Sequence, residues 1–254
     1  MKISFCLSII FLITFSQINY AQHTSKTKLD KDAGIMIGFD YGYNLVGKDM
    51  KTRFGNNLEF GSKASYMFKN SNWNLGLKAS YFFGDTVKQD ILTNLKDENG
   101  FIIGINGDYA QVKLRQRGFL VGAFISNIIP IGSVNERSGL RVDLGVNLMQ
   151  HWIRLQDDYN TVAQFNDPYK KGYDRLTNGF ALSEFIGYQY LSKNRRINLY
   201  GGLEFVQAWT KSRREYDFAT QSQMLESRLD LLNGFKLGLI LPIYIESQPD
   251  EIFY

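Results

Sequence analysis

The chain has 254 residues, a formal net charge of +4 at pH 7, 15% aromatic residues and a single cysteine, Cys6. So small a charge gives no reason to expect a nucleic-acid partner, and one cysteine excludes a disulfide framework and a cysteine-based metal site. The length suits one large all-β domain.

The first 21 residues have the plan of a secretory signal peptide. Lys2 supplies the positive start, residues 3–15 are almost wholly apolar, and Ala21 is a small residue before the expected cleavage point. The alternative is a membrane anchor, but this run is shorter than the ~20 apolar residues that a spanning helix needs. We therefore expect export of the chain, with residues 22–33 as a mobile segment before the first strand.

From residue 34 onward, apolar residues alternate with small or polar ones. Ile35, Ile37 and Phe39 share one face of the first segment and Asp40 lies on the other, because successive side chains of a strand point to opposite faces. The same pattern, with turn signals between segments, predicts eight strands. They are residues 34–46, 54–69, 73–84, 109–128, 139–155, 173–191, 197–210 and 228–244.

Two features complicate this pattern. In the fourth strand Val112 is out of phase with Phe119, which predicts a β-bulge near Gly118. The connection 86–108 is long enough to contain a further hairpin, with residues 101–105 as the best segment, so ten strands stay open beside eight.

The connections alternate in length. Those after the second, fourth and sixth strands are short, and those after the third, fifth and seventh are long and polar. Outer-membrane barrels have an even number of strands, short periplasmic turns and longer extracellular loops. We therefore expect a barrel over residues 34–245 with both termini in the periplasm, and a periplasmic tail at residues 246–254.

Alternation alone also fits a soluble ligand-binding barrel. An eight-stranded barrel has an interior just wide enough for side chains to fill, so we expect the small residues inside and the large apolar residues outside, in lipid. Tyrosine and tryptophan near the strand ends suggest aromatic girdles. They are Tyr41, Tyr43, Trp73, Tyr81, Trp152, Tyr188, Tyr190 and Trp209.

The face predicted to point inward carries four acids and four bases. Buried charges must be paired or they are strongly penalised, so a salt-bridged plug of the lumen is the favoured interpretation, and a narrow ion path is the alternative. The eight residues are Asp40, Glu59, Lys63, Lys78, Arg141, Asp143, Glu204 and Lys236.

Candidates for catalysis are few. His151 lies near the outer end of the fifth strand, with Asp157 and Asp158 close in sequence. A histidine at a barrel rim can act as a general base, so a protease or lipid-modifying enzyme is the alternative function. The chain has no phosphate loop, no metal-spaced histidine cluster and no nucleophile elbow, and we expect neither a cofactor nor a metal.

Three further residues are candidate contacts with a partner. Glu184 shares its face with apolar residues and would face lipid, where a carboxylate is costly. A local register shift, a site near the interface, or a partner protein would explain it, in that order. Arg213 and Arg214 open the connection 211–227, which is either a solvated loop or a contact with lipopolysaccharide or a partner. Residues 221–232 are expected to form an amphipathic turn.

The expected Ala-Gln cleavage point, residues 171–180 (KGYDRLTNGF) and the ending 234–244 (GFKLGLILPIY) together resemble small outer-membrane β-barrel proteins of Bacteroidota. The resemblance covers most of the chain after the expected cut. It implies an outer-membrane location and an accessory role in an envelope complex for barrel assembly or protein secretion. It implies no catalytic residue.

The sequence thus predicts an up-and-down antiparallel transmembrane β-barrel with a filled lumen, acting through its extracellular loops and outer wall. Outer-membrane lipid and other envelope proteins are the expected partners.

Overall fold

The computed structural model describes residues 33–131, 136–192, 198–224 and 227–245. The expected signal peptide, with Cys6, and the expected tail 246–254 lie outside the described residues. Most of the segment 22–33 does as well.

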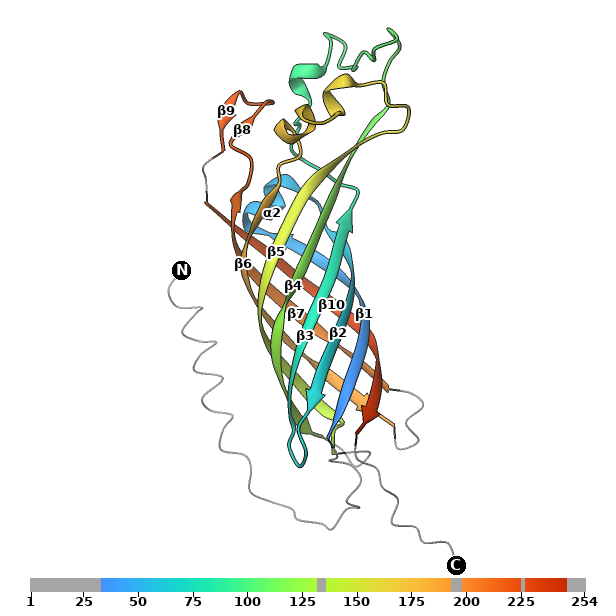
Figure 1. Cartoon of the computed structure of the whole chain (residues 1–254), viewed down its shortest axis with the longest axis vertical. Coiled ribbons are helices and arrows are strands. Elements are labelled where there is room, and N and C mark those ends of the chain that lie inside the picture. The colour runs from blue at the N-terminus through green and yellow to red at the C-terminus, as the bar shows by residue number, and fades with distance from the viewer. Residues whose placement is uncertain (1–32, 132–135, 193–197, 225–226, 246–254) are drawn as a thin grey trace, which may run out of the picture.

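Eight antiparallel strands close into one barrel in chain order, with β1 hydrogen-bonded to β10 (Figure 1). This confirms the predicted eight-stranded up-and-down fold. The barrel strands are β1 (Gly34–Gly47), β2 (Asn57–Met67), β3 (Trp73–Gly84), β4 (Val112–Pro130), β5 (Gly139–Asp157), β6 (Thr177–Leu191), β7 (Asn198–Ser212) and β10 (Ser227–Tyr244).

The predicted extra hairpin in 86–108 does not add to the barrel. This connection holds the 3-10 turn η3 (Thr93–Leu95) and two isolated bridges, Lys96 with Ile102 and Ile103 with Tyr109. The expected amphipathic turn at 221–232 is also wrong. There, β8 (Tyr216–Asp217) and β9 (Ser222–Gln223) form a small separate hairpin before β10 begins.

The two ends of the barrel differ, and we call them the loop end and the turn end. The long connections lie at the loop end, and the short connections and both ends of the described chain lie at the turn end (Figure 1). The connection after β1 folds as helix α2 (Lys48–Arg53), which the sequence analysis did not predict because six residues show too little periodicity. Met50 of α2 and the following Phe54 are fully buried in the barrel mouth.

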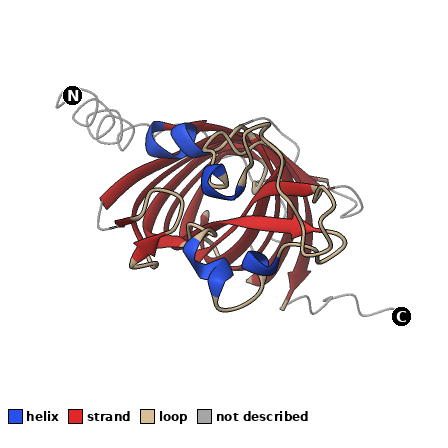
Figure 2. Ribbon diagram, turned by 90° about the horizontal axis from the view of Figure 1, so that it is seen from above, coloured by secondary structure: helices blue, strands red, loops and turns tan. Residues whose placement is uncertain are grey.

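The connections at the loop end pack into one cap over the opening, as Figure 2 shows from above. The β5–β6 connection holds η4 (Ala163–Phe165) and η5 (Tyr169–Gly172). Its Thr161 carbonyl accepts a hydrogen bond from the Ile105 amide at 2.8 Å, and its Tyr173 ring packs edge-on against Phe218 at 5.5 Å. Asn94 donates to the Phe218 carbonyl at 2.9 Å. The three long connections therefore support one another instead of standing free in solvent.

The predicted β-bulge near Gly118 is absent. Gly118 pairs with Phe82 on one side and His151 on the other, in an uninterrupted register. Val112 is on the inward face and packs against an apolar cluster at the loop end, whereas Phe119 points outward. The change of phase in the sequence therefore reflects a change in which face of β4 is apolar. It does not reflect an extra residue in the strand.

The barrel interior has three layers. Along β1, Met36 belongs to an apolar cluster at the turn end, Asp40 to a charged layer, and Val46 to a second apolar cluster at the loop end. The expectation that large side chains stay outside is therefore only half right, since Phe82 is fully buried inside. Glycine makes room for it: a Cβ added at Gly118 would lie 2.2 Å from the Phe82 ring.

The outer surface is predominantly apolar along the strands. Leu77 of β3 is 67% exposed, and Leu148 of β5, beyond the intervening β4, is 65% exposed. Among the described residues, no helix is long and apolar enough to cross a bilayer.

Candidate functional sites

The eight charged residues predicted to face the lumen all lie there and form the lumen charge cluster. Lys236 is its centre, because its ammonium lies 2.5 Å from Glu204, 2.6 Å from Glu59 and 3.8 Å from Asp40. Lys78 makes a second contact with Glu204 at 2.8 Å. Three carboxylates and two lysines thus join five strands, β1, β2, β3, β7 and β10.

The turn-end side of the lumen charge cluster is organised by an aromatic residue that the sequence analysis missed. The Tyr200 hydroxyl donates to Asp40 at 2.5 Å, and the Lys63 ammonium lies 4.2 Å from the centre of the Tyr200 ring. Arg141 pairs with Asp143 at 2.8 Å and lies 5.2 Å from the same ring. The inward parity of Tyr200, shared with Glu204, was the available signal.

Polar side chains add hydrogen bonds to several of these ions. Asn44 donates to Glu59 at 2.7 Å, Lys78 to the Ser183 hydroxyl at 2.8 Å, and Arg141 to the Gln189 side chain at 3.0 Å. Because buried ions need both a counter-ion and hydrogen-bond partners, this arrangement suits a rigid filled lumen.

His151, the candidate general base, lies in the lumen at the loop end and is fully buried. Its Nε2 lies 3.0 Å from Asp230, which also accepts a hydrogen bond from the Thr210 hydroxyl at 2.5 Å. Phe54 covers the imidazole with an edge contact at 5.6 Å. A general base must reach a substrate proton, and this histidine instead ties β5 to β10 and β7.

The aspartates that are close to His151 in sequence form hydrogen bonds with other residues. Asp157 accepts a hydrogen bond from the Val162 amide at 2.7 Å and so shapes the β5–β6 connection. Asp158 accepts one from Gln156 at 2.6 Å. Asp230 is the true neighbour of His151, and a separation of 79 residues hid this pairing from sequence analysis. Among the described residues, no group of three or more histidines, cysteines, aspartates or glutamates could hold a metal.

Glu184 faces outward, directly opposite Leu144 of β5 and Phe205 of β7. Both registers run without interruption through this position, so the favoured explanation, a local register shift, is wrong. Glu184 makes no hydrogen bond or ion pair with any described residue.

Arg213 and Arg214 are held by the β5–β6 side of the cap. Arg214 forms a bidentate pair with Asp174 at 2.8 and 2.5 Å, and Arg213 donates to the Asn178 side chain. The hydrogen bonds to Asp174 and the charge of that carboxylate raise the pKa of Arg214 above its ordinary value, although partial burial of the guanidinium acts in the opposite direction.

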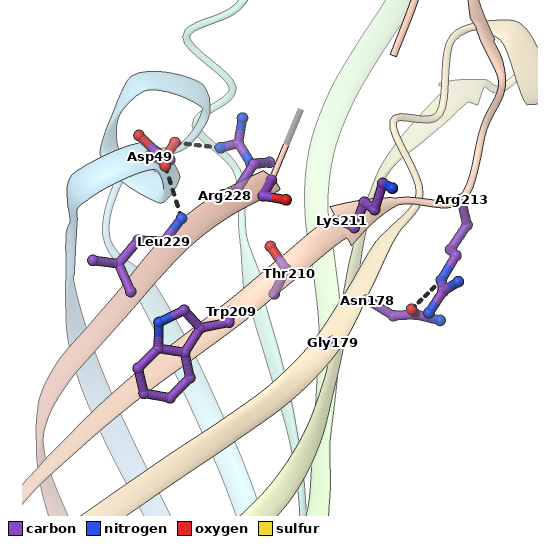
Figure 3. A pocket seen from close by; sticks show the side chains of 10 residues that line it. Asp49, Asn178, Gly179, Trp209, Thr210, Lys211, Arg213, Arg228 and Leu229 are labelled. Carbon is purple, nitrogen blue, oxygen red and sulfur yellow. Dashed lines mark hydrogen bonds between the residues drawn. The ribbon is translucent and has the colours of Figure 1, made fainter. Parts of the chain in front are cut away.

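A pocket of about 530 Å³ lies near Arg213, at the loop end of β6, β7 and β10 (Figure 3). Lys211, Arg213 and Arg228 bring three cations to its lining, which also includes Trp209 and Asp49. The Arg228 guanidinium donates a hydrogen bond to the backbone carbonyl of Asp49, and the Leu229 amide donates one to the Asp49 carboxylate. Lys211 is exposed.

No protein-family model and no curated protein sequence matches the chain. Similar solved structures are barrels. OprG of Pseudomonas aeruginosa, an outer membrane protein, is 14% identical with a TM-score of 0.40 over 83% of this chain and 96% of that one. Ail, the attachment invasion locus protein of Yersinia pestis, in complex with the heparin analogue sucrose octasulfate, is 12% identical with a TM-score of 0.37. The match covers 84% of this chain and 99% of that one. The outer membrane protease OmpT from Escherichia coli is 10% identical with a TM-score of 0.31. The match covers 88% of this chain and 99% of that one. Identities this low concern the fold alone.

Proposed function

We propose that this protein is an integral outer-membrane β-barrel with a filled lumen, serving as a structural or accessory subunit of an envelope complex. One observation carries the proposal: the outer wall of the barrel is predominantly apolar, while the charges of the lumen charge cluster are paired inside. A soluble barrel has the opposite arrangement, because water would meet the charged face.

The dimensions support a membrane location. A transmembrane strand needs about 9–11 residues, and β2, which has the fewest residues of the barrel strands, has 11. Aromatic rings are exposed towards both ends of the wall, Trp73 and Tyr66 at the turn end and Tyr43 and Trp209 at the loop end. This arrangement matches the two aromatic girdles of outer-membrane barrels.

The orientation follows from the connections. Long extracellular loops and short periplasmic turns are the rule for such barrels, so the packed cap faces outward and both termini face the periplasm. The lumen charge cluster and the apolar clusters on either side of it leave the cap and the outer wall as the working surfaces. We infer a binding role for these surfaces, not transport.

Heat-modifiable migration of the full chain tests the membrane barrel. We expect the protein in the outer-membrane fraction, migrating faster on SDS gels before heating than after it. A mature chain that stays soluble without detergent would overturn the proposal. In planar bilayers we expect no stable conductance, and a reproducible open channel would refute the filled lumen.

The cationic pocket supports a second element of the function, contact with the phosphate groups of lipid A. It lies just beyond the outward-facing Trp209, where the headgroups of the outer leaflet would lie, and Lys211 and Arg213 are placed to meet them. We expect K211A/R213A to weaken lipid A binding to the solubilised barrel at least fivefold. K170A/K171A, in η5 of another connection, is the matched control. Equal affinity for both double variants would contradict this contact.

A further inference from the structure

Three polar side chains interrupt the apolar outer wall and surround Phe205. Glu184 of β6 and Asn233 of β10 lie directly opposite Phe205 on its two sides, and Gln207 is two residues further along β7. All three point outward, because their parity along the strands is opposite to that of the lumen residues. We call this set the Glu184 patch.

The depth of Glu184 makes it unusual. On β6 it lies four residues from Phe180 towards the loop end and four from Tyr188 towards the turn end, and both rings are exposed. Its neighbours across the strands, Leu144 and Phe205, are each 39% exposed apolar residues. A carboxylate at this depth faces hydrocarbon, and ionisable residues in such positions are rare and costly.

No described residue compensates for the cost of placing the Glu184 carboxylate in hydrocarbon. Glu184 has no counter-ion among the described residues, and the other charged side chains on outward strand positions lie at the loop end of the wall. They are Lys113, Arg115, Arg117, Arg154 and Lys211.

We propose that the Glu184 patch is a lateral docking site for a different membrane-embedded protein, which places a lysine or arginine against Glu184. This rests on the outer-membrane location proposed above and names the partner chemistry of the outer wall. Charge complementarity selects the occupant, since a carboxylate in a low-dielectric medium is stabilised by a directly opposed cation. Gln207 and Asn233 add hydrogen-bonding groups at the rim of the same contact.

Two other occupants fit less well. A second copy in the same membrane would meet Glu184 with its own Glu184 at the same depth, and like charges repel. Its lysines and arginines on the wall lie nearer the loop end. A lipid headgroup lies at the membrane surface, whereas Glu184 lies midway along the wall between Phe180 and Tyr188.

Site-specific photo-crosslinking in intact cells tests the proposal. A photoreactive residue replaces Leu182, beside Glu184 on the same face, and the matched control position is Leu77 on β3, across the barrel from β7. We expect one discrete adduct with another membrane protein from position 182 and none from position 77. In the Glu184→Leu background the adduct falls at least tenfold, while Glu184→Asp retains it.

A charge exchange identifies the contact. Mass spectrometry of the adduct locates the partner's lysine or arginine, and replacing it with glutamate should abolish the adduct in the wild-type barrel and restore it with Glu184→Lys. An adduct unchanged by Glu184→Leu, no adduct, or an adduct with a second copy would overturn the proposal. If the barrel is heat-modifiable and in the outer membrane yet gives one of these results, only the docking site fails. If it is not in the membrane, the proposed function fails first.

Discussion

Lys236 is the residue whose loss should damage this barrel most clearly. Its ammonium is shared by Glu204, Glu59 and Asp40 within 3.8 Å, and its side chain is 4% exposed. Lys236→Met keeps an unbranched side chain that is only one heavy atom shorter, and it removes the charge. Three carboxylates in the lumen charge cluster then lose their common counter-ion.

Removing one partner of a buried ion pair costs about 3–5 kcal/mol, because the remaining charge stays buried without compensation. We expect Lys236→Met to lower the free energy of unfolding by this amount. The matched control is Lys96→Met in the cap. Lys96 pairs with Asp90 at 2.6 Å, but the two side chains are 33% and 50% exposed, and such pairs contribute about 0–1 kcal/mol.

Equilibrium unfolding by guanidinium in detergent micelles, followed by tryptophan fluorescence and by heat-modifiable migration, measures both variants. Adding Glu204→Gln to Lys236→Met should recover part of the loss, because one uncompensated charge disappears. Equal losses for Lys236→Met and Lys96→Met would refute the idea that the lumen charge cluster is a dry, tightly coupled network.

Two more predictions concern packing and pH. Gly187→Val should cost about 1–3 kcal/mol by overpacking, because even a Cβ at this position would lie 2.2 Å from the Gly201 carbonyl oxygen; an unfolding midpoint equal to the wild type would contradict this. The hydrogen bond from Lys96 holds the pKa of the Asp90 carboxyl below its ordinary value, so its small stabilisation is present at neutral pH and is lost as pH falls through that lowered pKa. NMR titration should show the Asp90 pKa rising in Lys96→Met, and an unchanged value would exclude this cause.

Local alternation predicted which residues face inward because strand parity is a property of neighbouring residues. It placed Asp40 and Lys236 on the lumen side although they belong to opposite ends of the chain. It failed where the environment changes along one strand. Val112 and Phe119 obey a single register, and only the apolar core beneath the cap explains why both faces of β4 carry large apolar residues.

The candidate catalytic residue shows the same limit. Sequence neighbourhood linked His151 to Asp157, but closure of the barrel brings β5 and β10 to opposite sides of one lumen and joins His151 to Asp230. A pairing over such a separation depends on how the strands are tilted and staggered around the barrel, and no local pattern encodes it.

By itself, the sequence determined the side of each strand that is apolar and the end of the barrel that carries the long connections, and it favoured eight strands while leaving ten open. These features depend on periodicity and turn residues within a few positions of one another. The tertiary structure alone decided that Tyr200 joins the lumen charge cluster, that the connections interlock as a cap, and that Glu184 stays in register with no counter-ion among the described residues. Those outcomes depend on which side chains meet when the eight strands close, and that is set by the geometry of the whole barrel.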